Sequence, residues 1–158
     1  MRDTAKWIGL SAFIVAADQL AKYAAVQYLA ANKAVAVTPF FNLILVYNSG
    51  AAFSVLSDAA GWQRGLFIAI ALVASAWIVS LLRKYPHQRL FALALSLVLA
   101  GAVGNVIDRI LIGAVIDFLD FHALGYHWPA FNVADSSITC GAALLIWDAL
   151  RPRRKAEG

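Results

Sequence analysis

The chain has 158 residues, of which 62% are hydrophobic and 14% are charged, whereas a soluble domain averages roughly 45–50% apolar and about 25% charged residues. The apolar surplus is spread over several long runs, which indicates an integral membrane protein rather than a soluble domain with a large core. The net charge of +4 does not indicate nucleic-acid binding, because the basic residues form short clusters between the apolar runs. The length is that of a single membrane domain, residues 1–158.

Four segments are long and apolar enough to cross a bilayer as helices, which takes about 20 mostly apolar residues. They are residues 7–26, 65–82, 90–107 and 133–150. The sequence therefore predicts an α-helical integral membrane protein with four transmembrane helices. A cleaved N-terminal signal peptide is the less favoured reading of the first segment, because its apolar character resumes after Lys22.

Lysine and arginine are concentrated at one end of the predicted helices, which sets their orientation. Nine of the thirteen basic residues lie before the first helix, between the second and third, or after the fourth. They are Arg2, Lys6, Arg83, Lys84, Arg89, Arg151, Arg153, Arg154 and Lys155. The distribution predicts that both termini face the cytoplasm and that residues 27–64 and 108–132 lie outside.

The two outer segments are expected to be extended. Residues 34–47 are rich in β-branched and aromatic residues and are interrupted by Pro39, which favours short strands or a hairpin lying on the membrane. Residues 110–132 are apolar but are broken by two glycines and Pro129. An extended stretch is therefore favoured there over a fifth span.

Ionisable side chains inside the predicted helices need a partner or a cavity, because a charge near the bilayer centre costs at least about 2.5–3.5 kcal/mol. Asp18 and Lys22 are four residues apart, so they share a helix face and can form an ion pair at about mid-membrane depth. Arg109 is expected to hold the neighbouring loop through its planar fork. Asp108 is expected to pair with a basic residue, and Asp120 to be solvated.

Asp117 and Asp135 are the candidate catalytic residues. Together with Asn105, Asp108 and Arg109 they are expected to cluster toward the outer surface. Two carboxylates that lie close together cannot both ionise cheaply, so one retains a proton at neutral pH. The ionised carboxylate can then take a proton from water while the protonated one polarises a carbonyl, which hydrolyses a peptide bond. A purely structural role for both residues remains the alternative.

Other chemistries have weaker support in the sequence, which lacks the H-E-x-x-H, G-x-S-x-G and phosphate-loop motifs. His122 and His127 are a weak metal signal, and no metal or cofactor is expected. The single cysteine, Cys140, excludes an intrachain disulfide and is expected to be a small packing residue. A rival catalytic pair is Lys22 with Ser49 or Ser54. Non-enzymatic alternatives are a small transporter with a polar interior or a membrane scaffold subunit.

Five motifs occur in order along nearly the whole chain. They are DQLAK at 18–22, YNSGAAFS at 47–54, GAVGNVIDR at 101–109, VIDF at 115–118 and FNVADSSI at 131–138. With these motifs the chain resembles the bacterial lipoprotein signal peptidases, also called signal peptidase II, which are aspartyl endopeptidases of the inner membrane.

The resemblance implies removal of signal peptides from prolipoproteins by cleavage just before a diacylglyceryl-modified cysteine. It places the catalytic pair on Asp117 and Asp135. Binding or supporting positions would be Asn48, Gly50, Asn105, Asp108, Arg109, Asn132 and Ala134, with Asp18 and Lys22 as structural polar residues. The resemblance also implies a small extracytoplasmic β-cradle and a short periplasmic helix within residues 34–64. Expected partners are diacylglyceryl-prolipoprotein substrates, membrane lipid and the cyclic peptide inhibitor globomycin.

Overall fold

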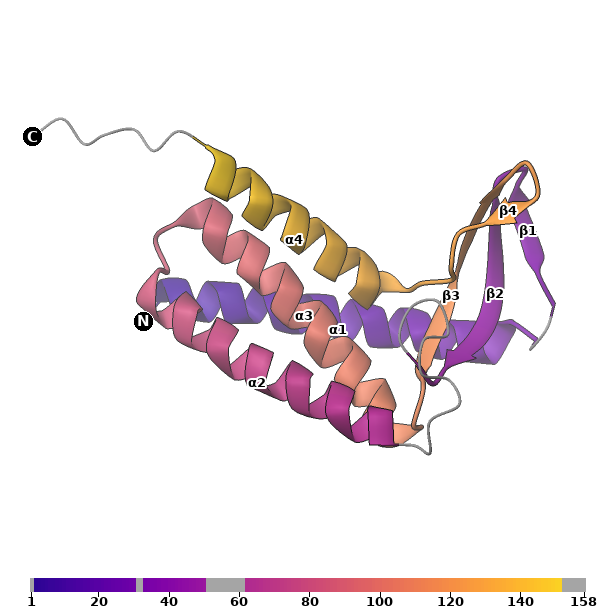
Figure 1. The fold of residues 1–158 in the computed structure, drawn as a ribbon, viewed down its shortest axis with the longest axis horizontal. Helices are drawn as coiled ribbons and strands as arrows, with labels where there is room; N and C mark the ends of the chain where they lie inside the picture. Colours follow the sequence, from indigo (N-terminus) through magenta and orange to yellow (C-terminus); the bar gives the residue numbers. More distant parts are fainter. Residues whose placement is uncertain (1, 31–32, 51–61, 152–158) are drawn as a thin grey trace, which may run out of the picture.

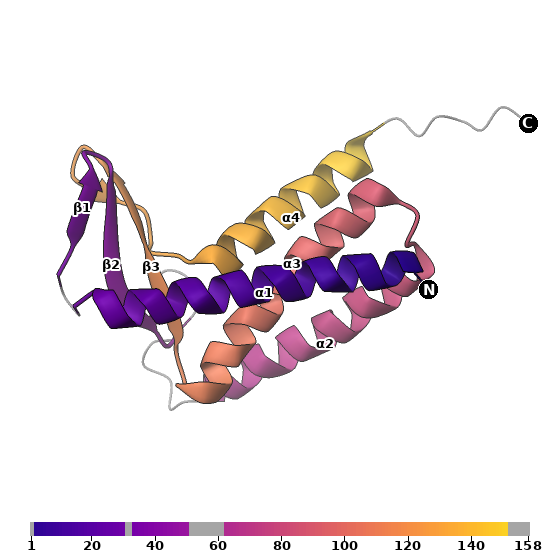
Figure 2. The same cartoon turned by 180° about the vertical axis from the view of Figure 1, so that it is seen from behind.

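The computed structural model describes residues 2–30, 33–50 and 62–151. It consists of a helical bundle with a small antiparallel sheet at one end (Figures 1 and 2). The helices are α1 (Arg2–Tyr28), α2 (Trp62–Lys84), α3 (Arg89–Leu111) and α4 (Val133–Leu150), and the strands are β1 (Val35–Thr38), β2 (Phe41–Asn48), β3 (Val115–Ala123) and β4 (Tyr126–His127). Each of the four segments that were predicted to be helical is a helix. Among the described residues, α2, α3 and α4 are long and apolar enough to cross a membrane.

Helix α3 lies at the centre of the bundle and packs against the three other helices (Figures 1 and 2). Many of its buried residues are small, so neighbouring backbones can approach closely. Helix α2, in contrast, buries few residues and leaves apolar side chains such as Ile70, Val73 and Trp77 exposed. An apolar surface around most of a helix is typical of one that faces lipid.

Close packing between α3 and α4 depends on glycines in both helices. A Cβ atom on Gly101 would collide with the backbone oxygen of Ala134 and would lie 2.5 Å from Cγ1 of Ile138. A Cβ atom on Gly141 would lie 2.7 Å from the backbone oxygen of Ala94. The first turn of α4 is therefore held directly against α3.

Gly101→Ala is expected to lower the free energy of unfolding by about 1–3 kcal/mol, because the added methyl group overpacks a helix contact against backbone atoms that cannot move aside. Gly9→Ala is the matched control, since a Cβ atom there meets nothing within 4 Å. Alanine at that helical position should be neutral or stabilising by up to about 1 kcal/mol. Thermal unfolding in detergent micelles measures both changes, and equal stabilities for the two variants would contradict the packing account.

The sheet has the order β1-β2-β3-β4 with antiparallel pairing. The prediction of short strands within residues 34–47 is confirmed, because β1 and β2 form a hairpin that turns at Pro39 and Phe40. The prediction that residues 110–132 are extended is confirmed for the part that forms β3. The described residues 33–50 contain no helix, and residues 51–61, where the expected short helix would precede α2, lie outside the described residues.

Helix α1 extends past the beginning of α4 and reaches the sheet (Figures 1 and 2). Asp18 was expected at mid-membrane depth, away from the outer cluster, and the structure corrects this expectation. The backbone N–H of Ala134, in the first turn of α4, donates a hydrogen bond to Oδ1 of Asp18 at 2.8 Å. Asp18 therefore lies level with the start of α4, because the outer end of α1 continues past α4 to the sheet.

Candidate active site

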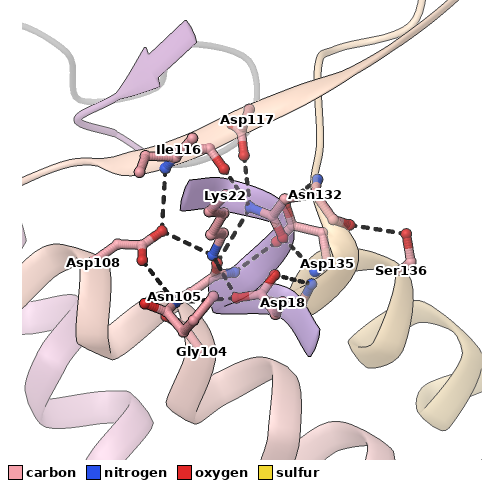
Figure 3. A network of polar contacts seen from close by, with 12 residues as sticks. Asp18, Lys22, Gly104, Asn105, Asp108, Ile116, Asp117, Asn132, Asp135 and Ser136 are labelled. Carbon is pink, nitrogen blue, oxygen red and sulfur yellow. Dashed lines mark hydrogen bonds and ion pairs between the residues drawn. The ribbon is translucent and has the colours of Figure 1, made fainter. Parts of the chain in front are cut away.

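The two candidate aspartates come from different elements and meet at one cavity. Asp117 is in the first half of β3, and Asp135 is in the first turn of α4. Both line a cavity of about 920 Å³ formed by the end of β2, the end of α3, β3, residues 128–131 and α4. Figure 3 shows their side chains in one network of polar contacts. The structure therefore brings together the pair that the sequence could only suggest.

Asn132 contacts both aspartates at once. Its Nδ2 donates to Oδ1 of Asp117 at 2.7 Å, and its Oδ1 accepts from the backbone N–H of Asp135 at 2.8 Å. The backbone N–H of Asn132 donates in return to Oδ2 of Asp135 at 3.3 Å, which completes a capping box at the start of α4. The side chain of Asn132 is 0% exposed. One buried residue therefore fixes the helix start and the position of both carboxylates.

Each aspartate has a second amide donor. Nδ2 of Asn48, at the end of β2, donates to Oδ2 of Asp117 at 3.1 Å. Nδ2 of Asn105, on α3, donates to Oδ1 of Asp135 at 2.7 Å. Both oxygens of each carboxylate thus accept a hydrogen bond, which orients the pair toward the cavity.

Asp117 is poised to hold a proton near neutral pH. Its side chain is only 2% exposed. Burial raises its pKa from 3.8 to about 6, and the nearby charge of Asp135 acts in the same direction. Hydrogen bonds from Asn48 and Asn132 favour the ionised form and partly oppose this rise in pKa. A pair in which one carboxyl titrates close to neutral pH is suited to general acid–base chemistry.

A buried ionic cluster lies directly behind the pair. Nζ of Lys22 is 2.8 Å from Oδ2 of Asp18 and 2.8 Å from Oδ2 of Asp108. The predicted Asp18–Lys22 pair is confirmed, and so is a basic partner for Asp108. Nζ of Lys22 also donates to Oδ1 of Asn105 at 3.0 Å, which joins the cluster to the aspartates (Figure 3).

Three comparisons with known proteins agree with this geometry. A family model described as "Signal peptidase (SPase) II" matches residues 10–151. Proteins named "Lipoprotein signal peptidase" from Burkholderia mallei (strain SAVP1) and Burkholderia multivorans (strain ATCC 17616 / 249) are both 55% identical over 153 residues, covering 97% of this chain and 92% of theirs. The chain belongs to the signal peptidase II family. The family predicted from the five motifs is therefore confirmed.

Solved structures extend the likeness from sequence to fold. A structure titled as a bacterial membrane enzyme at 2.3 Å resolution aligns with a TM-score of 0.84 and 33% sequence identity, covering 98% of this chain and 94% of that one. A second, at 1.9 Å resolution, aligns with a TM-score of 0.82 and 35% identity. The helical bundle with its small sheet is therefore the fold of a membrane enzyme.

Arg109 lines the cavity, and among the described residues its contacts are with helices α3 and α2 rather than with the loop after α3, where it was expected to act. Its NH1 donates to the backbone oxygen of Asn105 at 3.3 Å, and its guanidinium lies 5.1 Å from the centre of the Phe67 ring. Contacts near that loop come instead from Asp108, which accepts from the N–H of Ile116, and from Arg64, which donates to the oxygen of Ile110.

Two further expected residues support the site in different ways. Gly50 lines the cavity, and its N–H donates to Oδ1 of Asn48 at 3.1 Å, which aims the Asn48 amide at Asp117. Ala134 is fully buried between α3 and α4 and is not among the residues that line the cavity.

Sequence reasoning did not single out Gln19, whose Nε2 donates to Oδ1 of Asp108 at 2.9 Å. The sequence feature that could have indicated this role of Gln19 is its position next to Asp18 in the DQLAK motif.

Asp120 is buried rather than solvated, contrary to expectation. It accepts from Nδ2 of Asn42 at 2.9 Å and lies 2.8 Å from Nδ1 of His127. Burial acts to raise the pKa of Asp120, but these hydrogen bonds outweigh it and hold the pKa below its usual value. The rings of His122 and His127 stack at 4.9 Å. Within the described residues no group of metal-ligating side chains gathers there or elsewhere.

Cys140 also differs from expectation, because it is exposed and lines the cavity. Cys140 lies within an apolar run of α4, but it is on the side of that helix that faces away from the bundle. An apolar neighbourhood in the sequence therefore does not mean burial among the helices. The rival serine–lysine pair has no support among the described residues. Lys22 is occupied by Asp18, Asp108 and Asn105, while Ser49 lines the cavity and Ser54 lies outside the described residues.

Proposed function

We propose that this chain is an aspartyl endopeptidase that removes signal peptides from prolipoproteins, with Asp117 and Asp135 as its catalytic pair. The observation that carries the proposal is the cavity that both aspartates line, with the buried Asn132 bonded to each of them. The printed name of its relatives, lipoprotein signal peptidase, supplies the substrate class. A transporter or a scaffold subunit, the non-enzymatic alternatives, is not favoured by a family of peptidases.

The geometry supports hydrolysis by activated water. The ionised aspartate takes a proton from a water molecule, which attacks the carbonyl carbon of the scissile bond. The protonated aspartate donates a hydrogen bond to the carbonyl oxygen as negative charge develops there. Return of a proton to the leaving amine nitrogen then breaks the C–N bond. This sequence requires neither a covalent enzyme intermediate nor a bound cofactor.

The cavity is suited to a lipid-modified peptide. Apolar side chains of Val46, Trp128, Phe131 and Ile138 share its wall with the polar network. Because Cys140 and Thr139 are exposed on α4, the cavity is open along the outer face of that helix. Diacylglyceryl chains can stay in lipid there while the peptide bond reaches the aspartates. Globomycin-type cyclic peptides are proposed to occupy the same cavity.

The proposed topology has four membrane spans in the bacterial inner membrane, with both termini in the cytoplasm. Figure 1 places the beginning of α1, the loop between α2 and α3, and the end of α4 at the end of the bundle opposite the sheet. The basic residues of these described segments are Arg2, Lys6, Arg83, Lys84, Arg89 and Arg151. Reporter fusions at Lys33 should score as periplasmic and fusions at Pro86 as cytoplasmic. A cytoplasmic score at Lys33 would reverse the placement of the site.

The purified chain is expected to cleave a diacylglyceryl-modified prolipoprotein just before the modified cysteine. The same prolipoprotein without the lipid should be cleaved at least about tenfold less efficiently, a loss equivalent to about 1.4 kcal/mol of binding. Mass spectrometry of the products identifies the cleaved bond. If the folded protein does not cleave the modified substrate, the proposal is overturned. If it cleaves the modified and unmodified substrates at equal rates, the lipid has no role in recognition.

A further inference from the structure

The orientation of the Asn105 amide is fixed by Lys22. An ammonium group has three donors and no acceptor, so the end of Asn105 that faces Nζ of Lys22 at 3.0 Å must be its carbonyl oxygen. Nδ2 of Asn132 donates to the same oxygen at 3.3 Å. The NH2 end of Asn105 must then face Asp135, which accepts from it at 2.7 Å. Reversing this amide would place two donors against each other at Lys22.

Asp135 consequently meets donors that cannot change direction. One oxygen accepts from Asn105 and the other from the backbone N–H of Asn132. Asp135 also lies in the first turn of α4, where the helix dipole stabilises negative charge. These three features favour the ionised form of Asp135 and oppose the effect of its burial, which favours the neutral form.

Asp117 lies in a different environment. It is on a strand rather than at a helix end and is almost fully buried, and among the described residues its carboxylate accepts hydrogen bonds from the side-chain amides of Asn48 and Asn132. Burial favours its neutral form. A single proton held by the pair is therefore better placed on Asp117 than on Asp135.

Several charged groups surround Asp135, and their signs show how Lys22 acts. Lys22 and Asp18 come from α1, Asp108 and Arg109 from α3, and Asp117 from β3. Lys22 forms ion pairs with both Asp18 and Asp108, so the three together carry a net charge of −1 rather than a positive charge. The charge of Lys22 itself favours the ionised carboxylate of Asp135 and the charge of Asp18 opposes it, but the hydrogen bond from Asn105 has the larger effect. The orientation of Asn105 is therefore the main route by which Lys22 influences Asp135.

We propose that Lys22 is a positioning residue of the catalytic pair: by holding the carbonyl end of Asn105 it presents the NH2 end to Asp135, keeps Asp135 ionised and leaves the shared proton on Asp117. The inference rests on the proposed function, because it assigns roles within that pair. It makes Asp135 the group that activates water and Asp117 the group that polarises the carbonyl. It also explains why a lysine is buried in this part of the bundle.

The test compares the pH dependence of cleavage in Lys22→Met/Asp108→Asn and in Asp108→Asn. The double variant retains Asp18 alone, so the cluster keeps the net charge of −1 that it has in the parent. Without Lys22 the carbonyl end of Asn105 keeps only the longer bond from Asn132, at 3.3 Å, so the amide is held less firmly against Asp135. The acid limb of the rate profile should then move to higher pH by up to about one unit, the equivalent of one lost hydrogen bond to a charged group. Asp108→Asn retains the Lys22–Asn105 bond and should show no upward movement.

Asn105→Leu provides a second variant that keeps both ion pairs of Lys22. Its acid limb should also move upward, because the variant removes the Asn105–Asp135 bond through which Lys22 is proposed to act. An acid limb unchanged from the parent in either folded variant would overturn the inference, as would complete loss of cleavage in both, since a positioning residue tunes the pair and does not replace it. A folded parent that cleaves at no pH would instead refute the proposed function.

Discussion

Asp117→Asn and Asp135→Asn are each expected to lower cleavage of a diacylglyceryl-modified prolipoprotein by about 10³-fold or more. Each change is nearly isosteric and removes one of the two groups that must exchange protons with water and substrate. Because the two act as a unit, the double variant should lose little more than either single variant. Cleavage rates of the four purified proteins under identical micelle conditions measure this.

Asp120→Asn is the matched control for that experiment. Asp120 lies on the same strand as Asp117 and is also buried, at 4% exposure, but it faces Asn42 and His127 rather than the cavity. Its variant should cleave at a rate close to that of the parent. Globomycin binding to all of the variants checks that the cavity is intact. Near-parent cleavage by Asp117→Asn or Asp135→Asn would show that the pair is structural.

The parent should show a bell-shaped dependence of rate on pH whose two limbs belong to the pair rather than to either residue. The structure explains this coupling physically, since Asn132 donates to both carboxylates, through Nδ2 to Asp117 and through its backbone N–H to Asp135. Each aspartate variant lacks one of the two titrating groups, so any residual cleavage should lack the corresponding limb of the pH profile.

The sequence predicted the helices and strands because each has a strong local signal. Long apolar runs specify α2, α3 and α4, and the β-branched segment around Pro39 specifies the hairpin. The catalytic pair could be proposed from its carboxyl chemistry, but only the pairing of β2 with β3 and the capping of α4 by Asn132 bring Asp117 and Asp135 together.

Errors arose where a residue's environment depends on packing between distant elements. The depth of Asp18 depends on how far α1 extends beyond α4, which is not apparent from one helix alone. Asp120 is buried because Asn42, from another strand, covers it. Arg109 and Cys140 were assigned from their sequence neighbours, whereas their contacts depend on helix rotation: Arg109 turns toward Phe67, and Cys140 turns outward.

Replacement of Asp117 should also change how stability depends on pH. Its pKa is raised from 3.8 to about 6 in the folded protein, so folding is favoured while the group is protonated. Its contribution is fully present below about pH 4 and is lost as pH rises through about 6. The loss amounts to about 3 kcal/mol, the equivalent of about two pKa units. Asparagine does not titrate, so Asp117→Asn should gain stability relative to the parent by this amount between pH 4 and pH 8.

A constant offset accompanies that gain, because the NH2 group of asparagine must face Asn48 or Asn132, which are themselves donors. The test is therefore the change in the stability difference with pH, measured by thermal unfolding in micelles, rather than its value at one pH. Asp120→Asn should show the opposite sign. The pKa of Asp120 is lowered, so its ionised form stabilises the fold near neutral pH, and this contribution disappears only as pH falls through the lowered pKa. A difference between Asp117→Asn and the parent that is flat from pH 4 to pH 8 would show that Asp117 is not strained by burial, and the catalytic pair would lose the poised proton on which its chemistry depends.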